Sequence, residues 1–501
     1  MAEPPYRINE RRRWAGGARN NLFEAATPTR QRRRIPRTDN DTKSSVSDYG
    51  WRELLSGSRF LFSNFGPIRG AIFQMANYAV GCGFNVQYRG ANRAWGEQME
   101  EAIAQHDKIC DIRGGNYDFR SALILDLVSI IRDGDTGFLL TETENGYPLY
   151  QSIASHRLAS GRDGSSGEVT SGRFSGFSIC HGVIQNAFGR PVGYRICDEG
   201  APDEFTDIPA DSFGQFYRPE FSDQPRGIPW LSSAINDIAD IFDVRQFTKT
   251  GLKGVASRIF IETNEAGAPL DTNPLSGGPV ARDDHATPTV ERLEEGTMLY
   301  FRANSGSKVE VPNDQRPSSN SQDFMFDVLR GAFEALGWPI EFYNPEALGG
   351  ANIRLRVAQA MRTLEQLQEL ADKIARRKHL YAIAKLIKGG VLPPDADWWK
   401  IEHQMPRNIT VDNGRDTKAD LQALESGAMT FAEWFGRNGE DWQEQIVQKI
   451  TEREFLETEC KARGIDPDRI IPPAQRGGAP GQQQQQETND DEEVPKNKRR
   501  A

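Results

Sequence analysis

The longest helical pattern in the chain extends from about Ile353 to Lys388, where Gly389-Gly390 ends it. Glycine pairs favour the end of a helix because glycine adopts backbone conformations that other residues avoid. A helix of this length needs apolar partners along its whole face, and we expect these to be neighbouring subunits. Its apolar residues recur at helical spacing at Leu355, Ala358, Met361, Leu364 and within residues 367–374.

The length and hydropathy of the chain limit the classes of protein to which it can belong. Its 501 residues suffice for several compact domains, because single cores stop growing near about 250–300 residues. The mean hydropathy of −0.62 predicts a polar chain that is unstructured in part. No run of about 18 apolar residues occurs, which predicts no membrane span. The basic N-terminus lacks an apolar stretch, so we expect no secretory signal.

The chain lacks the sequence signatures of common catalytic and metal sites. It has five cysteines, an odd number, and no C-x-x-C pair, so we expect neither a disulfide framework nor a cysteine zinc site. No Gly-Lys dipeptide, H-E-x-x-H or G-x-S-x-G motif occurs, so we predict no nucleotide-binding Walker loop, cofactor or metal. His379 and His403 have no partner at a useful spacing and are assigned no role.

Charge is distributed unevenly along the chain. Residues 1–43 carry 11 Lys or Arg and 5 Asp or Glu, whereas the whole chain has a net charge of −10. We expect residues 1–50 to form a flexible basic arm, either simply solvated or in contact with nucleic acid or a partner. The Pro-, Gly- and Gln-rich segment 471–501 is typical of a disordered tail. The remaining acidic bulk predicts weak contact with DNA, because affinity for the duplex comes largely from Lys and Arg.

The first half of the chain mixes helical and strand patterns, which predicts an α+β fold with antiparallel strands. Pro67 stands where a second helix should start, and residues 84–88 alternate as in a strand. Asn145-Gly146 predicts a primed turn within a hairpin, and a second hairpin turns near residues 189–191. Helices are expected within residues 51–80, 95–106 and 119–132. Asp133 and Asp135 favour a turn, with a divalent cation site as the alternative.

The middle of the chain contains two more predicted helices. Pro229 suits the start of the first, on which Asp237, Asp240 and Asp243 form an acidic stripe beside an apolar face. The stripe is either a solvated face or a metal site, and we favour the solvated face. Short strands and a surface loop at 264–289 are expected next, followed by a helix over about 322–337 with Ser321 as its cap.

Several segments in order resemble the portal proteins of the phage lambda family. The most specific is Arg226-Gly227-Ile228-Pro229-Trp230-Leu231, which resembles the family's R-G-x-P-W-L segment. The family's Tyr-Ser-Ser-x-Arg stretch is replaced here by residues 351–354, in which only Arg354 matches. The resemblance covers about residues 50–465, and its other motifs are WREL with SRFL from residue 51, GFNVQ, GRPVGY, LEEGTM, ALGWPIEFYN and the segment from residue 408.

The resemblance implies the portal fold, which has a wing, a helical stem, a small clip containing strands and a helical crown, and which assembles as a ring of usually twelve subunits. By order along the chain, the implied regions are the wing at 51–229, the first stem helix at 230–253, the clip with adjoining strands at 254–320, the second stem helix at 321–337, the tunnel loop at 338–353, and the long helix with the crown at 354–470.

A ring multiplies each charge by its symmetry, so one aspartate per subunit becomes a closed belt that repels phosphates. We therefore predict that the acidic stripe faces the lumen of a DNA channel or the seams between its subunits, with weak phosphate contacts from Lys249 and Lys253. The alternative for these five residues is a salt-bridged face between subunits. The predicted tunnel loop includes Trp338, Glu341, Phe342, Tyr343, Asn344, Gly349, Gly350 and Arg354, and the alternative for its aromatic residues is ordinary core packing.

The expected function is that of a non-enzymatic portal at one vertex of a phage head, through which double-stranded DNA passes without sequence-specific binding. The implied partners are other copies of the chain, the terminase large subunit, a head–tail connector, and the major capsid and scaffold proteins. The implied location is the virion, after assembly in the host cytoplasm. The alternatives are a packaging-associated head enzyme, such as a nuclease or protease, and a ring adaptor of the head–tail joint, although such adaptors are usually far shorter.

Overall fold

The computed structural model divides the chain into two compact units, residues 1–413 and 414–501. It describes residues 46–158, 166–256, 260–263, 290–292, 299–303, 308–310, 319–344, 350–406, 409, 413–436, 440 and 442–463. The predicted arm before residue 46, the predicted tail at 471–501 and the predicted loop at 264–289 lie outside the described residues.

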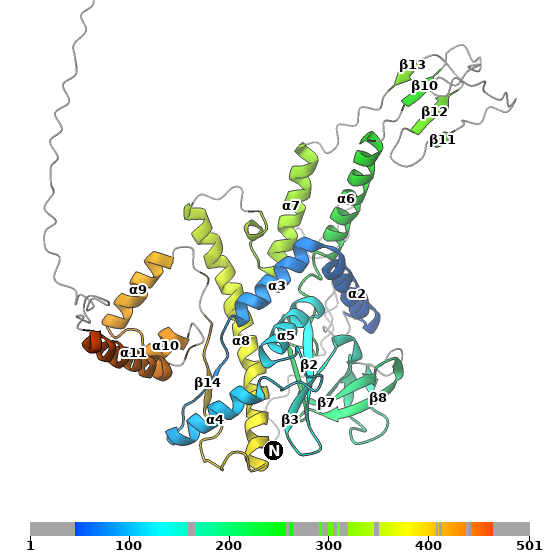
Figure 1. Ribbon diagram of the computed structural model, residues 1–501. Coiled ribbons are helices and arrows are strands. Elements are labelled where there is room, and N and C mark those ends of the chain that lie inside the picture. The colour runs from blue at the N-terminus through cyan, green and yellow to red at the C-terminus, as the bar shows by residue number, and fades with distance from the viewer. Residues whose placement is uncertain are drawn as a thin grey trace, which may run out of the picture. The chain divides into compact units, whose positions relative to one another are not determined.

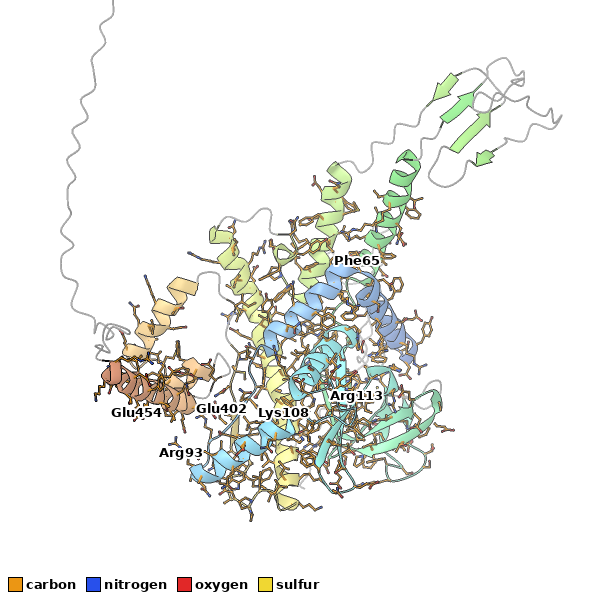
Figure 2. The ribbon with its side chains drawn as sticks, viewed as in Figure 1. Phe65, Arg93, Lys108, Arg113, Glu402 and Glu454 are labelled. Carbon is orange, nitrogen blue, oxygen red and sulfur yellow. The ribbon has the colours of Figure 1, made fainter. Side chains whose placement is uncertain are left out.

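Seven helices are described in the first unit. Pro67 lies in the first turn of its helix, as predicted, and side-chain oxygens of Ser47 and Asp118 accept hydrogen bonds from the first turns of two others. Buried Phe65 lies where the first two helices meet (Figure 2). The helices are α2 (Asp48–Asn64), α3 (Gly66–Val80), α4 (Arg93–His106), α5 (Phe119–Asp133), α6 (Ile235–Ala256), α7 (Ser319–Leu336) and α8 (Gly350–Lys388), with short 3-10 turns at Ser155–Arg157 and Ile340–Phe342.

Antiparallel strands form three sheets in this unit, which confirms the α+β prediction. The order within the first is β3-β2-β9, the second runs β4 to β8 in sequence order, and β1 pairs with β14. The strands are β1 (Val86–Tyr88), β2 (Asp135–Glu142), β3 (Pro148–Ile153), β4 (Gly167–Glu168), β5 (Ser178–Cys180), β6 (Val183–Gln185), β7 (Pro191–Asp198), β8 (Ala201–Pro209), β9 (Phe213–Tyr217) and β14 (Ile401–His403).

The β2–β3 hairpin forms as predicted, but its turn is not primed. Glu142 pairs with Pro148, so five residues connect the strands. Gly146 has a φ of 78° and donates to the carbonyl of Thr143 at 2.8 Å, whereas Asn145 is not among the described non-glycine residues with positive φ. A type I′ turn needs positive φ at both central residues. The longer loop accommodates the single left-handed glycine instead.

Four short strands between α6 and α7 form a separate sheet, in agreement with the strands expected in residues 255–320. Its order is β11-β12-β10-β13, and β10 pairs in parallel with β12 and antiparallel with β13. The strands are β10 (Phe260–Thr263), β11 (Val290–Arg292), β12 (Leu299–Ala303) and β13 (Lys308–Glu310).

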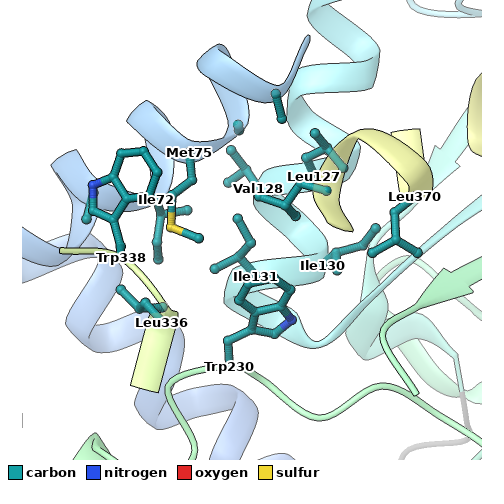
Figure 3. Close-up of a cluster of buried hydrophobic side chains, with 14 of the residues drawn as sticks. Ile72, Met75, Leu127, Val128, Ile130, Ile131, Trp230, Leu336, Trp338 and Leu370 are labelled. Atoms are coloured by element: carbon teal, nitrogen blue, oxygen red, sulfur yellow. The ribbon is translucent and has the colours of Figure 1, made fainter. Parts of the chain in front are cut away.

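One hydrophobic core joins helices that are far apart in the sequence. It contains residues from α2, α3, α5, α6, α7 and α8, and α6 and α7 lie side by side next to it (Figure 1). Figure 3 shows Ile72 and Met75 of α3 facing Val128 and Ile131 of α5, with Trp230 and Trp338 close by. Burial of large apolar side chains is the main contribution to stability.

The long helix α8 forms as predicted and packs within its own chain over most of its length. Leu364, Leu367 and Ile374 are buried in the core, but Leu355 near its first turn is 60% exposed. The prediction that these apolar residues pack against neighbouring subunits was therefore wrong for Leu364, Leu367 and Ile374, which pack within the chain.

Three predicted helix boundaries were wrong. Helix α8 begins at Gly350 rather than at Ile353, and α6 begins at Ile235 because residues 231–234 form turns after Pro229. Helix α7 begins at Ser319, so Ser321 lies inside the helix and does not cap it. Local propensity alone does not fix the first turn of a helix.

The second unit consists of the helices that follow residue 412. They are α9 (Asn413–Glu425), α10 (Phe431–Gly436) and α11 (Trp442–Arg463). Phe435 of α10 and Cys460 of α11 are buried within this unit. Within the residues that the structure describes, no helix combines the length and apolar character that crossing a membrane requires.

Candidate functional site

The acidic stripe predicted from the sequence lies on one exposed side of α6. Asp237, Asp240 and Asp243 are all exposed, while Ile238 and Ile241 beside them on the helix are buried in the core. The helical period produces this division, because residues three apart share a face. In the single chain, the stripe is therefore an exposed negative surface next to a buried apolar face.

The two predicted lysines follow the stripe on the same helix. Lys249 is exposed, and the side chain of Lys253 lies outside the described residues. Phe247, between Asp243 and Lys249, is 72% exposed. The described part of α6 therefore presents negative charge first and positive charge later along its length.

The segment before α6 is fixed by a buried ion pair. The guanidinium of Arg226 donates to both carboxylate oxygens of Asp135, at 2.7 and 3.0 Å, and both side chains are almost fully buried. It also donates to the carbonyls of Ser155 at 2.8 Å and Leu158 at 2.7 Å. Buried charges are tolerated when they are paired and hydrogen-bonded in this way.

The residues after Arg226 are fixed by close backbone contact. A Cβ on Gly227 would lie 1.9 Å from the carbonyl oxygen of Gly134, so only glycine fits without a shift. The indole of Trp51 donates to the carbonyl of Gly227 at 3.1 Å and lies 3.9 Å below the Arg226 guanidinium. The amide of Trp230 donates to the carbonyl of Ile131 at 3.1 Å. The R-G-x-P-W-L motif thus sets where α6 starts.

Asp133 at the end of α5 and Asp135 at the start of β2 each form ion pairs with arginine. Asp133 accepts hydrogen bonds from Arg59 and Arg132, and Asp135 accepts from Arg226. Burial opposes ionisation of Asp133, but the hydrogen bonds from Arg132 and Arg59 outweigh it, and its pKa is lowered. Neither the turn nor the cation interpretation predicted these ion pairs. No group of three or more His, Cys, Asp or Glu is placed to hold a metal ion in the described part of the chain.

The segment after α7, predicted as part of a tunnel loop, is anchored in the core. Trp338 is buried, and its ring stacks on Phe342 at 4.8 Å and on Tyr78 of α3 at 6.3 Å. Thr363 of α8 donates to the carbonyl of Gly337 at 2.7 Å. The core-packing alternative therefore describes Trp338, whose side chain holds the beginning of the segment in place.

The segment becomes more exposed as it proceeds. Glu341 forms an ion pair with Arg356 of α8 at 3.0 Å, and Asn344 is half-buried. Tyr343 is 48% exposed. Gly349 lies outside the described residues, whereas Gly350 and Arg354 belong to α8 rather than to a loop. The predicted loop is thus shorter than residues 338–353.

His379 and His403, which were assigned no role because neither has a partner at a useful sequence spacing, contact each other in the structure. Nδ1 of His379 lies 2.9 Å from Nε2 of His403, and both rings are buried. Strand β14 returns alongside α8 and brings together residues that are 24 positions apart. No motif spacing signals this contact. Arg226, by contrast, was present in a recognised motif although its role was not predicted.

With the geometry described, comparison with known proteins identifies the family. Residues 29–346, more than half of the chain, match the family described as phage portal protein, lambda family. The chain belongs to this family. The matched region of this portal-family chain includes the R-G-x-P-W-L motif, the acidic stripe and the segment from Trp338 to Asn344, and it ends before α8.

No curated protein matches the chain. Among solved structures, it is similar to chains from the neck of a gene transfer agent particle. For the neck of the empty particle, computed with C6 symmetry, the identity is 15%, the match covers 76% of this chain and 90% of the other, and the TM-score is 0.45. For the native particle with C12 symmetry, the coverage and identity are the same and the TM-score is 0.43. For the native virion, the identity is 14%, the coverage is 75% and 89%, and the TM-score is 0.44.

Proposed function

We propose that twelve copies of this chain close into a ring at one vertex of a phage head and that double-stranded DNA passes through the ring during packaging and ejection. Membership of the lambda portal family supports this proposal. The observation that carries it is the solvated acidic stripe on α6, since a channel for a polyanion needs a wall that does not bind it tightly.

In this proposal the regions of the chain have separate tasks. Helices α6 and α7 form the stem, and the four-stranded sheet between them forms the clip. Residues 51–229 form the wing, and the segment after α7 forms the tunnel loop, with α8 and the following residues to 470 as the support and the crown. The terminase large subunit and the head–tail connector dock on the ring, which the capsid and scaffold proteins hold in the head.

The acidic stripe acts by repulsion. Twelve copies of Asp237, Asp240 and Asp243 form belts of negative charge around the channel, which raise the free energy of phosphates at the wall. Lys249 and Lys253 supply weak phosphate contacts farther along α6, which screening by salt makes easy to break. DNA driven by a separate motor then slides with little friction.

Replacing the stripe tests this role directly. We expect the triple substitution Asp237→Asn, Asp240→Asn and Asp243→Asn to reduce the amount of packaged DNA severalfold and to slow its ejection, because the wall then holds the phosphates longer. The measurement is the DNA content of heads assembled with the variant. The matched control removes the same charge from exposed positions in the β7–β8 region, through Asp198→Asn, Glu199→Gln and Asp211→Asn.

Two outcomes would contradict the proposal. Unchanged packaging and retention in the stripe variant would exclude a role for α6 as the channel wall. Negative-stain images of the purified chain should show rings with a central hole, and a chain that remains a single subunit under every assembly condition would exclude the portal ring itself.

A further inference from the structure

A continuous chain of hydrogen bonds crosses the interior of the first unit. Nδ1 of His403 lies 2.7 Å from a carboxylate oxygen of Asp372, and Nε2 of His403 lies 2.9 Å from Nδ1 of His379. Nε2 of His379 lies 3.2 Å from a carboxylate oxygen of Asp107. Two histidines in direct contact are thus flanked by two carboxylates.

Three elements meet at this chain. Helix α8 supplies Asp372 and His379, β14 supplies His403, and the residue after α4 is Asp107. Both imidazoles are fully buried, and the ring of Phe119 stacks on His379 at 4.1 Å between centroids. Water therefore cannot replace a hydrogen bond that is lost inside this cluster.

The number of protons decides whether all three contacts are hydrogen bonds. Each contact needs one proton, whereas two neutral imidazoles carry only two. Both carboxylates are acceptors: the hydrogen bond from His403 lowers the pKa of Asp372, and His379 and His106 outweigh the effect of burial and lower the pKa of Asp107. If each histidine donates to its aspartate, bare nitrogens face each other across 2.9 Å.

We propose that His379 and His403 share one additional proton, so that the pair is a single buried imidazolium that holds β14 against α8 and that loosens when pH departs from neutrality in either direction. With three protons every contact becomes a hydrogen bond. With four protons, the two facing N–H groups and the two positive charges repel each other. With two protons, when each histidine donates to its aspartate, the two facing lone pairs repel each other.

The sign of the pH dependence follows from proton counts in the two states. Unfolded histidines titrate near a pKa of about 6.5, so the unfolded pair changes from two bound protons to none around that pH. The folded pair retains one on both sides of it. Burial lowers the pKa of His379 although the charge and hydrogen bond of Asp107 raise it, and burial therefore opposes a second proton on the pair. The contact is therefore strongest near pH 6.5, and above it the opening constant rises up to about tenfold per pH unit.

Other charged and titratable groups surround the pair. On α8, Arg376 donates to the carbonyl of Ile401 at 2.7 Å, and Lys373 lies near Asp372. Nδ1 of His106 lies 3.5 Å from Asp107, beside the ring of Tyr147. Burial raises the pKa of Cys110 to about 12 and that of Tyr150 well above 10. On β14, Glu402 pairs with Arg89, the residue after β1. Of these, His106 is a third histidine close to the pair and is included in the test.

The substitution Asp372→Asn separates proton sharing from simple packing. The new amide can donate to Nδ1 of His403, whose Nε2–H then donates to His379, whose Nε2–H donates to Asp107. Two neutral histidines now satisfy all three contacts. The matched control is Glu369→Gln, which removes an equal charge from an exposed position one turn earlier on α8.

Hydrogen exchange of the full-length chain measures the effect. The relevant amides join β14 to the β1 region and belong to Phe84, Arg89 and Gln404. Variant and wild type are compared at the same pH, so that intrinsic exchange cancels. Between about pH 6.5 and about pH 9, we expect these amides to exchange progressively faster in the wild type than in Asp372→Asn, by up to about tenfold per pH unit. Glu369→Gln should follow the wild type.

A ratio of exchange rates that is constant with pH, or a Glu369→Gln variant that behaves like Asp372→Asn, would overturn the proposal. If Asp372→Asn does not fold, Asp107→Asn repeats the test, since its amide can donate to His379 from the other end. Independently, nitrogen NMR of ¹⁵N-histidine in the assembled chain should show one imidazolium at neutral pH that is lost in His403→Gln and retained in His106→Gln. Two neutral rings in the wild type would exclude the shared proton.

Discussion

The segment before α6 and the exposed side of α6 use charge in opposite ways. Arg226 and Asp135 are buried, paired and hydrogen-bonded, whereas Asp237, Asp240 and Asp243 are exposed to solvent. A buried pair fixes geometry, because breaking it leaves a charge without solvent. Exposed charges contribute little to stability and act through their field. Charged residues therefore fix the backbone before α6, whereas on α6 itself they form an exposed negative surface.

The largest effect should come from breaking the buried pair. Arg226→Ala leaves the carboxylate of Asp135 buried beside Ser155 and Leu158 without its partner. We expect the free energy of unfolding to fall by about 3–5 kcal/mol, measured by denaturant titration. Arg218→Ala is the control, since this residue is partly exposed and lies over the Trp230 ring at 3.9 Å, and it should cost only about 1 kcal/mol. Equal losses in the two variants would remove the distinction between buried and exposed charge.

A smaller loss should follow from adding one methyl group beside the anchor. Gly227→Ala places a Cβ against the Gly134 carbonyl, and the backbone shift should cost about 1–3 kcal/mol. Gly331→Ala inside α7 is the matched control, because its Cβ would meet nothing within 4 Å. That control should gain up to about 1 kcal/mol from helix propensity. A neutral Gly227→Ala would show that the contact at the start of α6 is not tight.

The half-buried pair of Asp48 and His181 should make a smaller contribution to the free energy of unfolding, and this contribution should depend on pH. Asp48 accepts a hydrogen bond from His181, and although burial opposes it, this contact raises the pKa of His181 to about 9. A raised folded pKa means that the stabilisation is complete below the unfolded pKa of about 6.5 and is lost as pH rises towards 9. Because Asp48 is partly exposed, we expect about 1 kcal/mol or less. Unfolding of His181→Gln should lack this pH-dependent component, and an unchanged profile would contradict the assignment.

The smallest effect on folding should come from the acidic stripe. Asp237→Asn, Asp240→Asn and Asp243→Asn should each change the free energy of unfolding by no more than about 0.5 kcal/mol, because the side chains are solvated. Denaturant titration of the triple variant checks this value before its DNA packaging is measured. A large loss of stability would place the aspartates in structural contacts and would end the comparison with Arg226.

Much of the fold follows from local patterns in the sequence. The positions of α5, of the β2–β3 hairpin and of α3, with Pro67 in its first turn, were predictable, because apolar periodicity and turn residues act over a few positions. The first residues of α6, α7 and α8 were not, since the ends of these helices depend on what packs around them. The stripe on α6 was predictable as a set of residues on one helix face, and its exposure agrees with the solvated face that the sequence favoured.

The sequence by itself determined the order of helices and strands, the acidic face of α6 and the motif that precedes it. Only the tertiary structure decided that Arg226 meets Asp135, 91 residues away, and that His379 meets His403. The physical reason is that periodicity encodes which side of an element is apolar, whereas the partner of a buried charge is chosen by how distant elements pack. Such a partner must then be present, because a buried charge or a bare imidazole nitrogen has no water to replace it.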